Sequence, residues 1–201
     1  MKRCSDQSLL GQQLASLHLD NQKRRERGEQ CVEKFGFDVD TCCGFLPQSN
    51  TWNSSWLDFY THKLEEQISM QPTDAELQQV WSTLKKSLEK LFLDVDVFPS
   101  LLHGDLWSGN IGQVEDDPVI FDPASFYGHH EYDLAIGKMF GGFNKDFHQS
   151  YHSIIPKQPG FEERSNLYQL FHYLNHWNHF GDGYRGQSIS LLKGLVKNVS
   201  K

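Results

Sequence analysis

One short segment, between residues 97 and 128, interrupts a chain that is otherwise patterned for helices. Within it the apolar stretches "NIGQV" and "VIFD" flank the turn sequence "EDDP". Two short apolar runs around a tight polar turn are typical of a β-hairpin. On either side of this segment, apolar residues recur at helical spacing. The sequence therefore predicts a mainly α-helical fold that carries one small β-hairpin.

The helical pattern is clearest between residues 73 and 91. Thr73 and Glu76 have the spacing of a capping box. The apolar stripe that follows them consists of Leu77, Val80, Trp81, Leu84, Leu88 and Leu91. Similar spacing predicts further helices over residues 6–20, from residue 52 onward, and over 131–141, 143–154, 161–180 and 187–199. Residues 21–51 show no sustained period, so we expect an irregular connection there.

Length, charge and cysteine usage limit the class of protein. The 201 residues suit a single domain over 1–201, and they carry a formal net charge of −7, which argues against a binder of the nucleic-acid backbone. No apolar stretch approaches the roughly 20 residues that cross a bilayer, and the N-terminus lacks the apolar core of a signal peptide. The four cysteines form neither a CxxC pair nor a spaced framework. We therefore expect reduced thiols in a cytosolic protein, with no nucleic-acid or membrane partner.

The polar residues suited to chemistry gather around the hairpin. Asp105 lies five positions before Asn110 in "HGDLWSGN", and Asp122 ends the returning strand. Because a hairpin brings its ends together, Asn110 and Asp122 would lie side by side as oxygen ligands suited to Mg²⁺. Asp105 would lie next to them, where a carboxylate can orient an attacking hydroxyl and accept its proton. The order Asp, Asn, Asp matches a kinase catalytic loop and predicts phosphoryl transfer from ATP.

A simpler interpretation exists for each of these residues taken singly. Asp and Asn are common in turns, where their side chains cap the loop, but loop capping does not account for the ordered set. His103, two positions before Asp105, we interpret as a structural hydrogen-bonding residue rather than a proton-transfer group.

Two further patterns resemble known sites. Residues 181–186 satisfy GxGxxG, but that pattern binds phosphate when it follows a strand, and here it follows a predicted helix, so we interpret it as a helix end and loop. His172, His176 and His179 recur on one helical face, as in a zinc site. Because no carboxylate or thiolate is obviously placed to complete such a site, packing or hydrogen bonding is the interpretation that we favour for these histidines.

Longer stretches resemble one family over nearly the whole chain. The segments that carry the likeness to the fructosamine 3-kinase and ketosamine 3-kinase family are "LLHGDLWSGN", "FDPASFYGHHEYDLAIGKMFGGF", "LYQLFHYLNHWNHFG" and "KFGFDVDTCCGFLPQ". This resemblance implies the C-terminal lobe of an aminoglycoside-phosphotransferase-like, protein-kinase-like α+β fold, with the catalytic loop and metal-binding hairpin at 101–128. It also implies an enzyme that uses MgATP to phosphorylate the 3-hydroxyl of a ketosamine (fructosamine, ribulosamine or psicosamine), free or on a glycated protein lysine. The resemblance further implies that the resulting 3-phosphate is unstable and detaches, which removes the sugar from the glycated protein.

The resemblance also implies roles for single residues. Carried over by motif, Asp105 is the catalytic base, and Asn110 and Asp122 hold the metal. Asp133, in "EYDLA", takes the position that supports the catalytic loop in the wider phosphotransferase group.

For the sugar, the resemblance suggests aromatic walls. Trp107 would stack on it beside the catalytic aspartate, and His176 and Trp177 would line the opposite side. Trp177 also shares a helical face with Leu170 and Leu174, and the helical core is the interpretation that we favour for it.

The resemblance does not extend to an N-terminal kinase lobe. That lobe would supply a loop over the phosphates and a strand Lys that holds them, and both are missing from this sequence. We therefore expect a truncated chain with little activity alone. Two alternatives to catalysis stay open: a non-catalytic fragment that acts as a binding or regulatory module, and a metal-dependent hydrolase. The preferred ketosamine and the oligomeric state also stay open.

Overall fold

A computed structural model describes residues 4–200 of the chain and is mainly helical, as the sequence predicts. The helices are α1 (Gln7–Glu26), α2 (Trp56–Ser69), α3 (Ala75–Lys85), α4 (Gly137–Phe140), α5 (Lys145–Ile154), α6 (Phe161–Phe180) and α7 (Arg185–Val199). The strands are β1 (Thr41–Cys43), β2 (Leu46–Gln48), β3 (Ser100–Leu102), β4 (Ile111–Val114), β5 (Asp117–Ile120) and β6 (Phe126–Gly128). They form the two-stranded antiparallel pairs β1–β2, β3–β6 and β4–β5.

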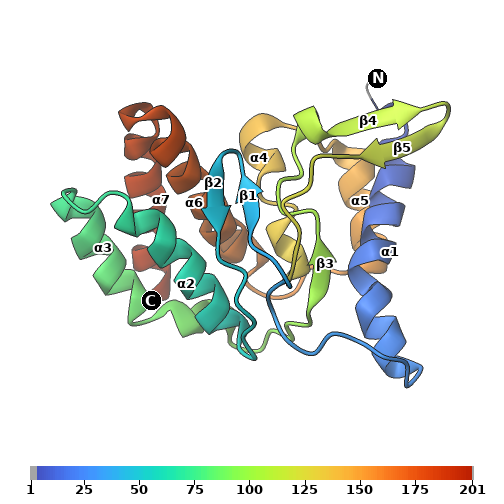
Figure 1. Ribbon diagram of the computed structural model, residues 1–201, viewed down its shortest axis with the longest axis horizontal. Coiled ribbons are helices and arrows are strands. Elements are labelled where there is room, and N and C mark those ends of the chain that lie inside the picture. Colours follow the sequence, from blue (N-terminus) through green and yellow to red (C-terminus); the bar gives the residue numbers. More distant parts are fainter. Residues whose placement is uncertain (1–3, 201) are drawn as a thin grey trace.

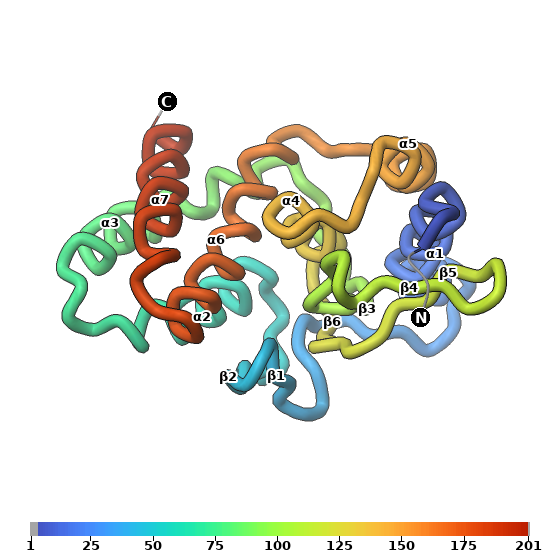
Figure 2. The backbone as a smooth tube through the Cα atoms, turned by 90° about the horizontal axis from the view of Figure 1, so that it is seen from above, coloured from blue at the N-terminus to red at the C-terminus, as the bar shows by residue number. Residues whose placement is uncertain are grey.

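Two groups of helices flank the strands (Figures 1 and 2). On one side α6 packs against α2 and α7, and α3 packs against α7, around the larger apolar core. On the other side α1 lies along α5 around a smaller core that includes Leu106 and Ile111. The β1–β2 and β3–β6 pairs and α4 lie between the two groups, whereas the β4–β5 hairpin lies over one end of α1.

The predicted hairpin is present and has a regular register. Ile111 lies opposite Ile120, and Val114 lies opposite Asp117. The other two pairs were not predicted. Each of their strands has only three residues, which is too short to display an alternating pattern. The β3–β6 pair joins the segment before the catalytic loop to the segment after Asp122, so the loop is fixed at both ends.

The helix beginning at residue 75 shows how a cap differs from its prediction. The side chain of Asp74, rather than Thr73, accepts a hydrogen bond from the Leu77 N–H at 2.8 Å. Asp74 is also fixed from the far side by Arg185, at 2.6 Å, and the same guanidinium binds Glu76. Because the N-cap is Asp74, one residue later than expected, Glu76 stands at the second helical position and the capping box expected at Thr73 does not form.

The prediction of one helix over 131–141 is wrong. The segment instead forms a 3₁₀ turn, His130–Tyr132, and the single-turn helix α4. Gly141 and Gly142 end α4 with φ of +72° and +140°, which a continuing helix does not allow. Within the 3₁₀ turn the Glu131 carboxylate binds the Arg164 guanidinium of α6 through two bonds, of 2.7 and 2.8 Å, and both side chains are buried. This ion pair anchors the segment that leads to Asp133.

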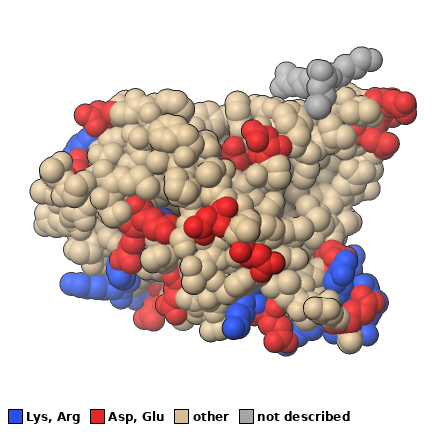
Figure 3. Space-filling model, in the orientation of Figure 1, with Lys and Arg blue, Asp and Glu red and all other residues tan. Residues whose placement is uncertain are grey.

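The surface carries more acidic than basic groups. On the face shown in Figure 3, Asp and Glu lie across the middle as well as the edges, and most Lys and Arg lie along the lower edge. None of the helices described within residues 4–200 is both long and apolar enough to cross a membrane.

Candidate active site

The catalytic loop runs from the end of β3 to the start of β4. Gly104 has a φ of +85°, a conformation that favours glycine, and a Cβ there would collide with the carbonyl oxygen of Ala124. The Ala124 N–H in turn donates to the His103 carbonyl at 2.8 Å. The loop is therefore pressed against the segment that follows Asp122.

Asp105 and Asn110 are joined across this loop. The Asn110 amide nitrogen Nδ2 donates to the Asp105 backbone carbonyl at 2.8 Å and to its carboxylate oxygen Oδ2 at 3.2 Å. These bonds hold the Asp105 carboxylate in place. Both bonds come from the nitrogen of the amide, and the Asn110 oxygen Oδ1 accepts no hydrogen bond from residues 4–200.

Asp122 lies two residues after the end of β5, near enough to Asp105 for its charge to act on that carboxyl. The Phe121 N–H donates to the Asn110 carbonyl at 3.2 Å, which closes the open end of the hairpin. Asp122 has a φ of +58°, a left-handed conformation that costs a non-glycine residue about 1–3 kcal/mol and that recurs at functional sites. The structure thus brings together the three residues that the sequence singled out.

The Asp105 carboxyl titrates above its ordinary range. Burial raises the pKa of Asp105 most, and the nearby Asp122 charge raises it further. His103, the Asn110 hydrogen bond and His176 act in the opposite direction. A raised pKa makes this carboxylate a better proton acceptor than an exposed aspartate.

His103 makes hydrogen bonds with the loop itself. Its Nε2 donates to the Phe121 carbonyl at 2.9 Å, and its Nδ1 accepts from the Asp105 N–H at 3.2 Å. Since a carbonyl only accepts and an amide N–H only donates, the ring is the tautomer with its proton on Nε2. Both ring nitrogens are used to position Asp105 and the end of β5.

Asp133 lies behind the loop and binds its backbone. One carboxylate oxygen accepts from the His103 N–H at 2.7 Å, and the other accepts from the Gly104 N–H at 2.8 Å. His18 of α1 approaches Asp133 at 3.2 Å and Tyr151 of α5 at 2.8 Å. Burial alone would raise the pKa of Asp133, but the His18 hydrogen bond and nearby positive charge hold it below its ordinary value.

A cavity of about 190 Å³ opens in front of Asp105. It is enclosed by the catalytic loop, the β1–β2 turn, α4 and one face of α6. The lining residues are Cys43, Gly44, Asp105, Trp107, Ile136, Phe140, Asn175, His176, His179 and Phe180. The cavity therefore combines aromatic walls with a few polar groups near the Asp105 carboxylate, as ligand pockets commonly do.

The aromatic residues proposed for the sugar divide into two groups. Trp107 and His176 both line the cavity, and each packs against Phe140, with ring centroids 5.9 and 4.7 Å apart. Trp177 does not line it. That side chain is 2% exposed in the larger core, and its indole N–H donates to Asp182 at 3.0 Å.

The structure also describes the GxGxxG segment and the histidine pattern, neither of which we interpreted as a ligand site. The segment 181–186 forms the end of α6, a 3₁₀ turn and the first residues of α7, and it follows no strand. His179 has both ring nitrogens engaged, by the Asn175 carbonyl at 2.7 Å and the Phe45 N–H at 3.1 Å. It is therefore not free to join His172 and His176 around a metal.

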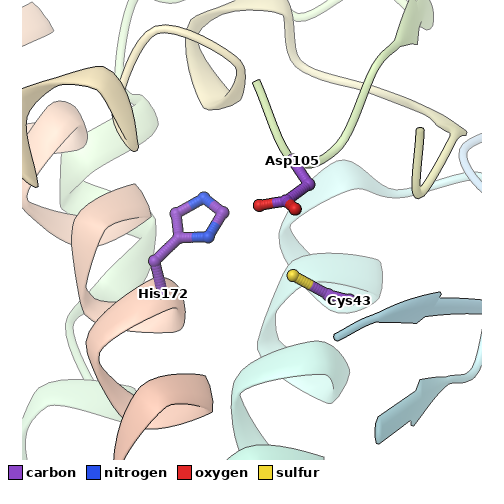
Figure 4. Close-up of side chains that lie close together, drawn as sticks. All are labelled: Cys43, Asp105 and His172. Carbon is purple, nitrogen blue, oxygen red and sulfur yellow. The ribbon is translucent and has the colours of Figure 1, made fainter. Parts of the chain in front are cut away.

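Two residues of the site, Cys43 and Asn175, carry no recognisable sequence signal, and His172 was singled out only through the spacing of the three histidines. Cys43 of β1 and Asn175 of α6 line the cavity, and His172 lies beneath it, beside Cys43 and Asp105 (Figure 4). The Asn175 amide donates to the Cys43 carbonyl at 3.3 Å, across 132 positions of the chain. Burial lowers the pKa of His172 to about 3 and raises that of the Cys43 thiol, so both groups are neutral at pH 7.

Comparison with known proteins assigns the chain to a family. The model of the fructosamine kinase family matches residues 1–198. The chain belongs to this family. The mouse protein named ketosamine-3-kinase is 52% identical, and the match covers 94% of this chain and 67% of the mouse protein. The Arabidopsis thaliana protein named protein-ribulosamine 3-kinase, chloroplastic, is 42% identical, over 96% of this chain and 58% of that protein.

Solved structures agree with the fructosamine kinase assignment. Crystal structures of proteins provisionally described as fructosamine-3-kinases superpose with TM-scores of 0.81 (Haemophilus somnus, 26% identical) and 0.79 (Thermobifida fusca, 28% identical). The matches cover 97 and 98% of this chain, but 64 and 66% of those chains. The chain thus spans about two thirds of the length of the relatives and structures that it matches, and less of the plant relative.

Proposed function

We propose that this chain carries the catalytic and acceptor-binding part of an ATP-dependent ketosamine 3-kinase, which phosphorylates the 3-hydroxyl of free or protein-bound ketosamines and so leads to deglycation. One observation carries the proposal: in a member of the fructosamine kinase family, Asp105 lines a cavity of about 190 Å³, is hydrogen-bonded by Asn110, and lies near enough to Asp122 for that charge to act on it. ATP and a ketosamine, as small molecule or glycated lysine, are the proposed partners.

In this mechanism Asp105 orients the acceptor hydroxyl and takes its proton. The hydroxyl oxygen bonds to the γ-phosphorus of ATP while the bond to the ADP oxygen breaks, and the proton moves to Asp105. The Asn110 hydrogen bonds fix the carboxylate that performs this step, and its raised pKa suits proton acceptance. Asp133 and His103 act as positioning residues, because they bind the loop rather than the reacting atoms.

The residues around the hairpin suit Mg²⁺. The free Asn110 oxygen and the exposed Asp122 carboxylate are hard oxygen ligands, and Asp122 has no hydrogen-bond partner among the described residues. When bound, Mg²⁺ neutralises charge on the phosphates of ATP. We therefore keep Asn110 and Asp122 as the proposed metal ligands.

The cavity supports a sugar-sized acceptor. Trp107 and His176 present ring surfaces to it, and the apolar faces of a sugar pack well on such rings. Because Trp177 lies in the core, we no longer propose it for substrate contact and keep the other two.

We further propose that the chain corresponds to the C-terminal lobe of its longer relatives, as one domain, and acts in the cytosol. In the kinase pattern an N-terminal lobe supplies the phosphate-covering loop and the phosphate-binding Lys. Turnover should therefore need such a lobe. If none is supplied, the same pocket supports the alternative function, a non-catalytic module that binds ketosamines.

The test compares this chain with a version extended by the N-terminal lobe of the mouse ketosamine-3-kinase. Each is mixed with MgATP and fructoselysine, and ketosamine-dependent ADP release is followed. We expect turnover in the extended form and little in the short one. In the extended form Asp105→Asn should lower kcat by at least about 100-fold, while Asp116→Asn, in the exposed β4–β5 turn, should not change it.

Three outcomes would count against the proposal. Full activity of Asp105→Asn would remove its assigned base. Ketosamine binding without turnover in the extended form would favour the binding module. Hydrolysis of a test ester or phosphate without ATP would favour a metal-dependent hydrolase.

A further inference from the structure

A buried imidazole without partners lies under the cavity. The His172 side chain is 0% exposed, and neither Nδ1 nor Nε2 has a hydrogen-bond partner within residues 4–200. Buried polar groups nearly always have a partner, and leaving one unpaired costs about 1–3 kcal/mol. A group that the protein binds at this point would remove that cost.

Two side chains of the kind that bind a metal ion lie close to His172. Cys43 Sγ, one Asp105 carboxylate oxygen and a ring nitrogen of His172 all lie within 4.8 Å of one another. Figure 4 shows the three side chains converging from β1, the catalytic loop and α6. Asn110 engages only the Asp105 oxygen Oδ2, and the Asn175 amide donates to Cys43 Sγ at 3.4 Å, a weak bond that leaves further lone pairs of the sulfur for a metal.

We propose that Cys43, Asp105 and His172 form a binding site for a zinc-class divalent cation, with a fourth position open to the cavity. Thiolate, imidazole and carboxylate are the ligands that Zn²⁺ takes in proteins, whereas Mg²⁺ prefers oxygen alone. The thiol proton of Cys43 leaves as the metal–sulfur bond forms.

The required movement is small. Zn–S bonds of about 2.3 Å and Zn–N bonds of about 2.0 Å at tetrahedral angles place ligand atoms roughly 3.5 Å apart. The three atoms lie within 4.8 Å now, so a contraction of about 1 Å completes the site. Side-chain rotation supplies such a shift.

A second cluster of potential metal ligands lacks these properties. His129, His130 and Glu131 also lie within 4.8 Å of one another. Both oxygens of Glu131 bind the Arg164 guanidinium, and the two histidines bond to tyrosine hydroxyls at 2.7 and 3.1 Å. This second cluster therefore has no free carboxylate oxygen, although His129 Nε2 has no hydrogen-bond partner within residues 4–200, whereas Cys43 and Asp105 of the first cluster line a cavity.

The position of the site has a functional consequence that rests on the proposed function. Asp105 is the proposed base, and a cation bound to its carboxylate blocks proton transfer from the acceptor hydroxyl. The cation also fills the end of the cavity nearest the reacting atoms. Zinc and a ketosamine should therefore exclude one another, and a chelator should reverse the effect.

The test titrates Co²⁺ alone into the metal-free chain of 201 residues and records the absorption spectrum. We expect one equivalent to bind with a thiolate-to-cobalt charge-transfer band, and Zn²⁺ to displace it. Cys43→Ser should abolish this band, and Cys43→Ser and His172→Gln should each weaken Co²⁺ binding by about 100-fold or more. The matched controls are Cys42→Ser, the exposed neighbour on β1, and His62→Gln, exposed on α2, and neither should change the band or the affinity.

Circular dichroism shows whether each variant keeps its fold. If His172→Gln unfolds, Cys43→Ser decides alone, because serine keeps a similar shape. No stoichiometric binding, or a charge-transfer band that survives in Cys43→Ser, would overturn the proposal.

Competition separates this inference from the proposed function. Fructoselysine should release bound Co²⁺ from the chain. Cobalt bound through Cys43 and His172 but not released by fructoselysine would support the metal site and count against the acceptor pocket. Ketosamine-dependent ADP release by the extended form, without any cobalt binding, would support the kinase and refute the metal site.

Discussion

Replacing Asp133 by Asn tests whether one buried carboxylate holds the catalytic loop. The Asp133 side chain is fully enclosed and accepts hydrogen bonds from the backbone N–H groups of His103 and Gly104, with His18 as a third neighbour. Asparagine has the same shape, but only one of its two terminal atoms accepts. Whichever way the new amide turns, at least one backbone N–H faces a donor.

The magnitude follows from these contacts. A hydrogen bond to a charged acceptor contributes about 1.5–3 kcal/mol, and the N–H left behind is buried and unpaired. The neutral amide costs less to bury than the carboxylate, which offsets part of the loss. We therefore expect Asp133→Asn to lower the free energy of unfolding by about 2 kcal/mol at pH 7.

The dependence of this loss on pH has a definite sign. The pKa of Asp133 is lower in the folded protein than in an unfolded chain, so its contribution is fully present above the unfolded value of about 3.9. It is lost as the pH falls through the folded pKa. The difference between Asp133→Asn and the parent should therefore shrink below about pH 4.

Urea unfolding measures the stability, and hydrogen exchange measures the loop. The amides of His103 and Gly104 should lose protection in Asp133→Asn, while Asp116→Asn, in the exposed turn, should match the parent in both assays. Unchanged protection of these two amides, or a loss of stability below about 0.5 kcal/mol, would refute the reasoning that Asp133 supports the loop.

Two other substitutions test the packing around the site. Gly104→Ala places a methyl group against a backbone carbonyl at a φ of +85° and should cost at least about 2 kcal/mol in urea unfolding, and a loss below about 0.5 kcal/mol would contradict the steric argument. Lys63 lies in the core, where burial lowers its pKa to about 8, so the unfolded chain binds more protons than the folded one between about pH 8 and 10.4. The stability of the parent relative to Lys63→Met should therefore rise over that interval by up to about 3 kcal/mol. The exposed control Lys34→Met should show no such trend, and a flat difference for Lys63→Met would contradict the assigned pKa.

Helices were predictable where local pattern and local boundaries agree. The sequence predicts α6 over 161–180, and the structure has it at Phe161–Phe180, between Gly160 and Gly181, which both have positive φ. The segment 131–141 has similar apolar spacing but does not form one helix. There the Glu131 pair with Arg164 and the Asp133 bonds to the loop are long-range contacts that override local preference.

The same distinction between local patterns and long-range contacts applies to the candidate site. Asp105 and Asn110 lie in one loop and Asp122 lies at the far end of one hairpin, so sequence spacing alone predicted their proximity, and the structure places them together. Cys43 and His172 come close only because β1 contacts α6, where Asn175 donates to Cys43. Because these elements are far apart in the chain, no spacing pattern in the sequence predicts the contact between Cys43 and His172.

The backbone of Asp122 has a consequence for engineering proteins of this family. At a φ of +58° a non-glycine residue costs about 1–3 kcal/mol, which exceeds the roughly 0.4–1 kcal/mol that glycine loses through the entropy of the unfolded chain, so Asp122→Gly should raise the melting temperature. On the proposed mechanism the same change would remove a magnesium ligand. Selection for heat resistance alone would therefore favour inactive variants at this position, and a library designed for thermostability should keep Asp122 fixed.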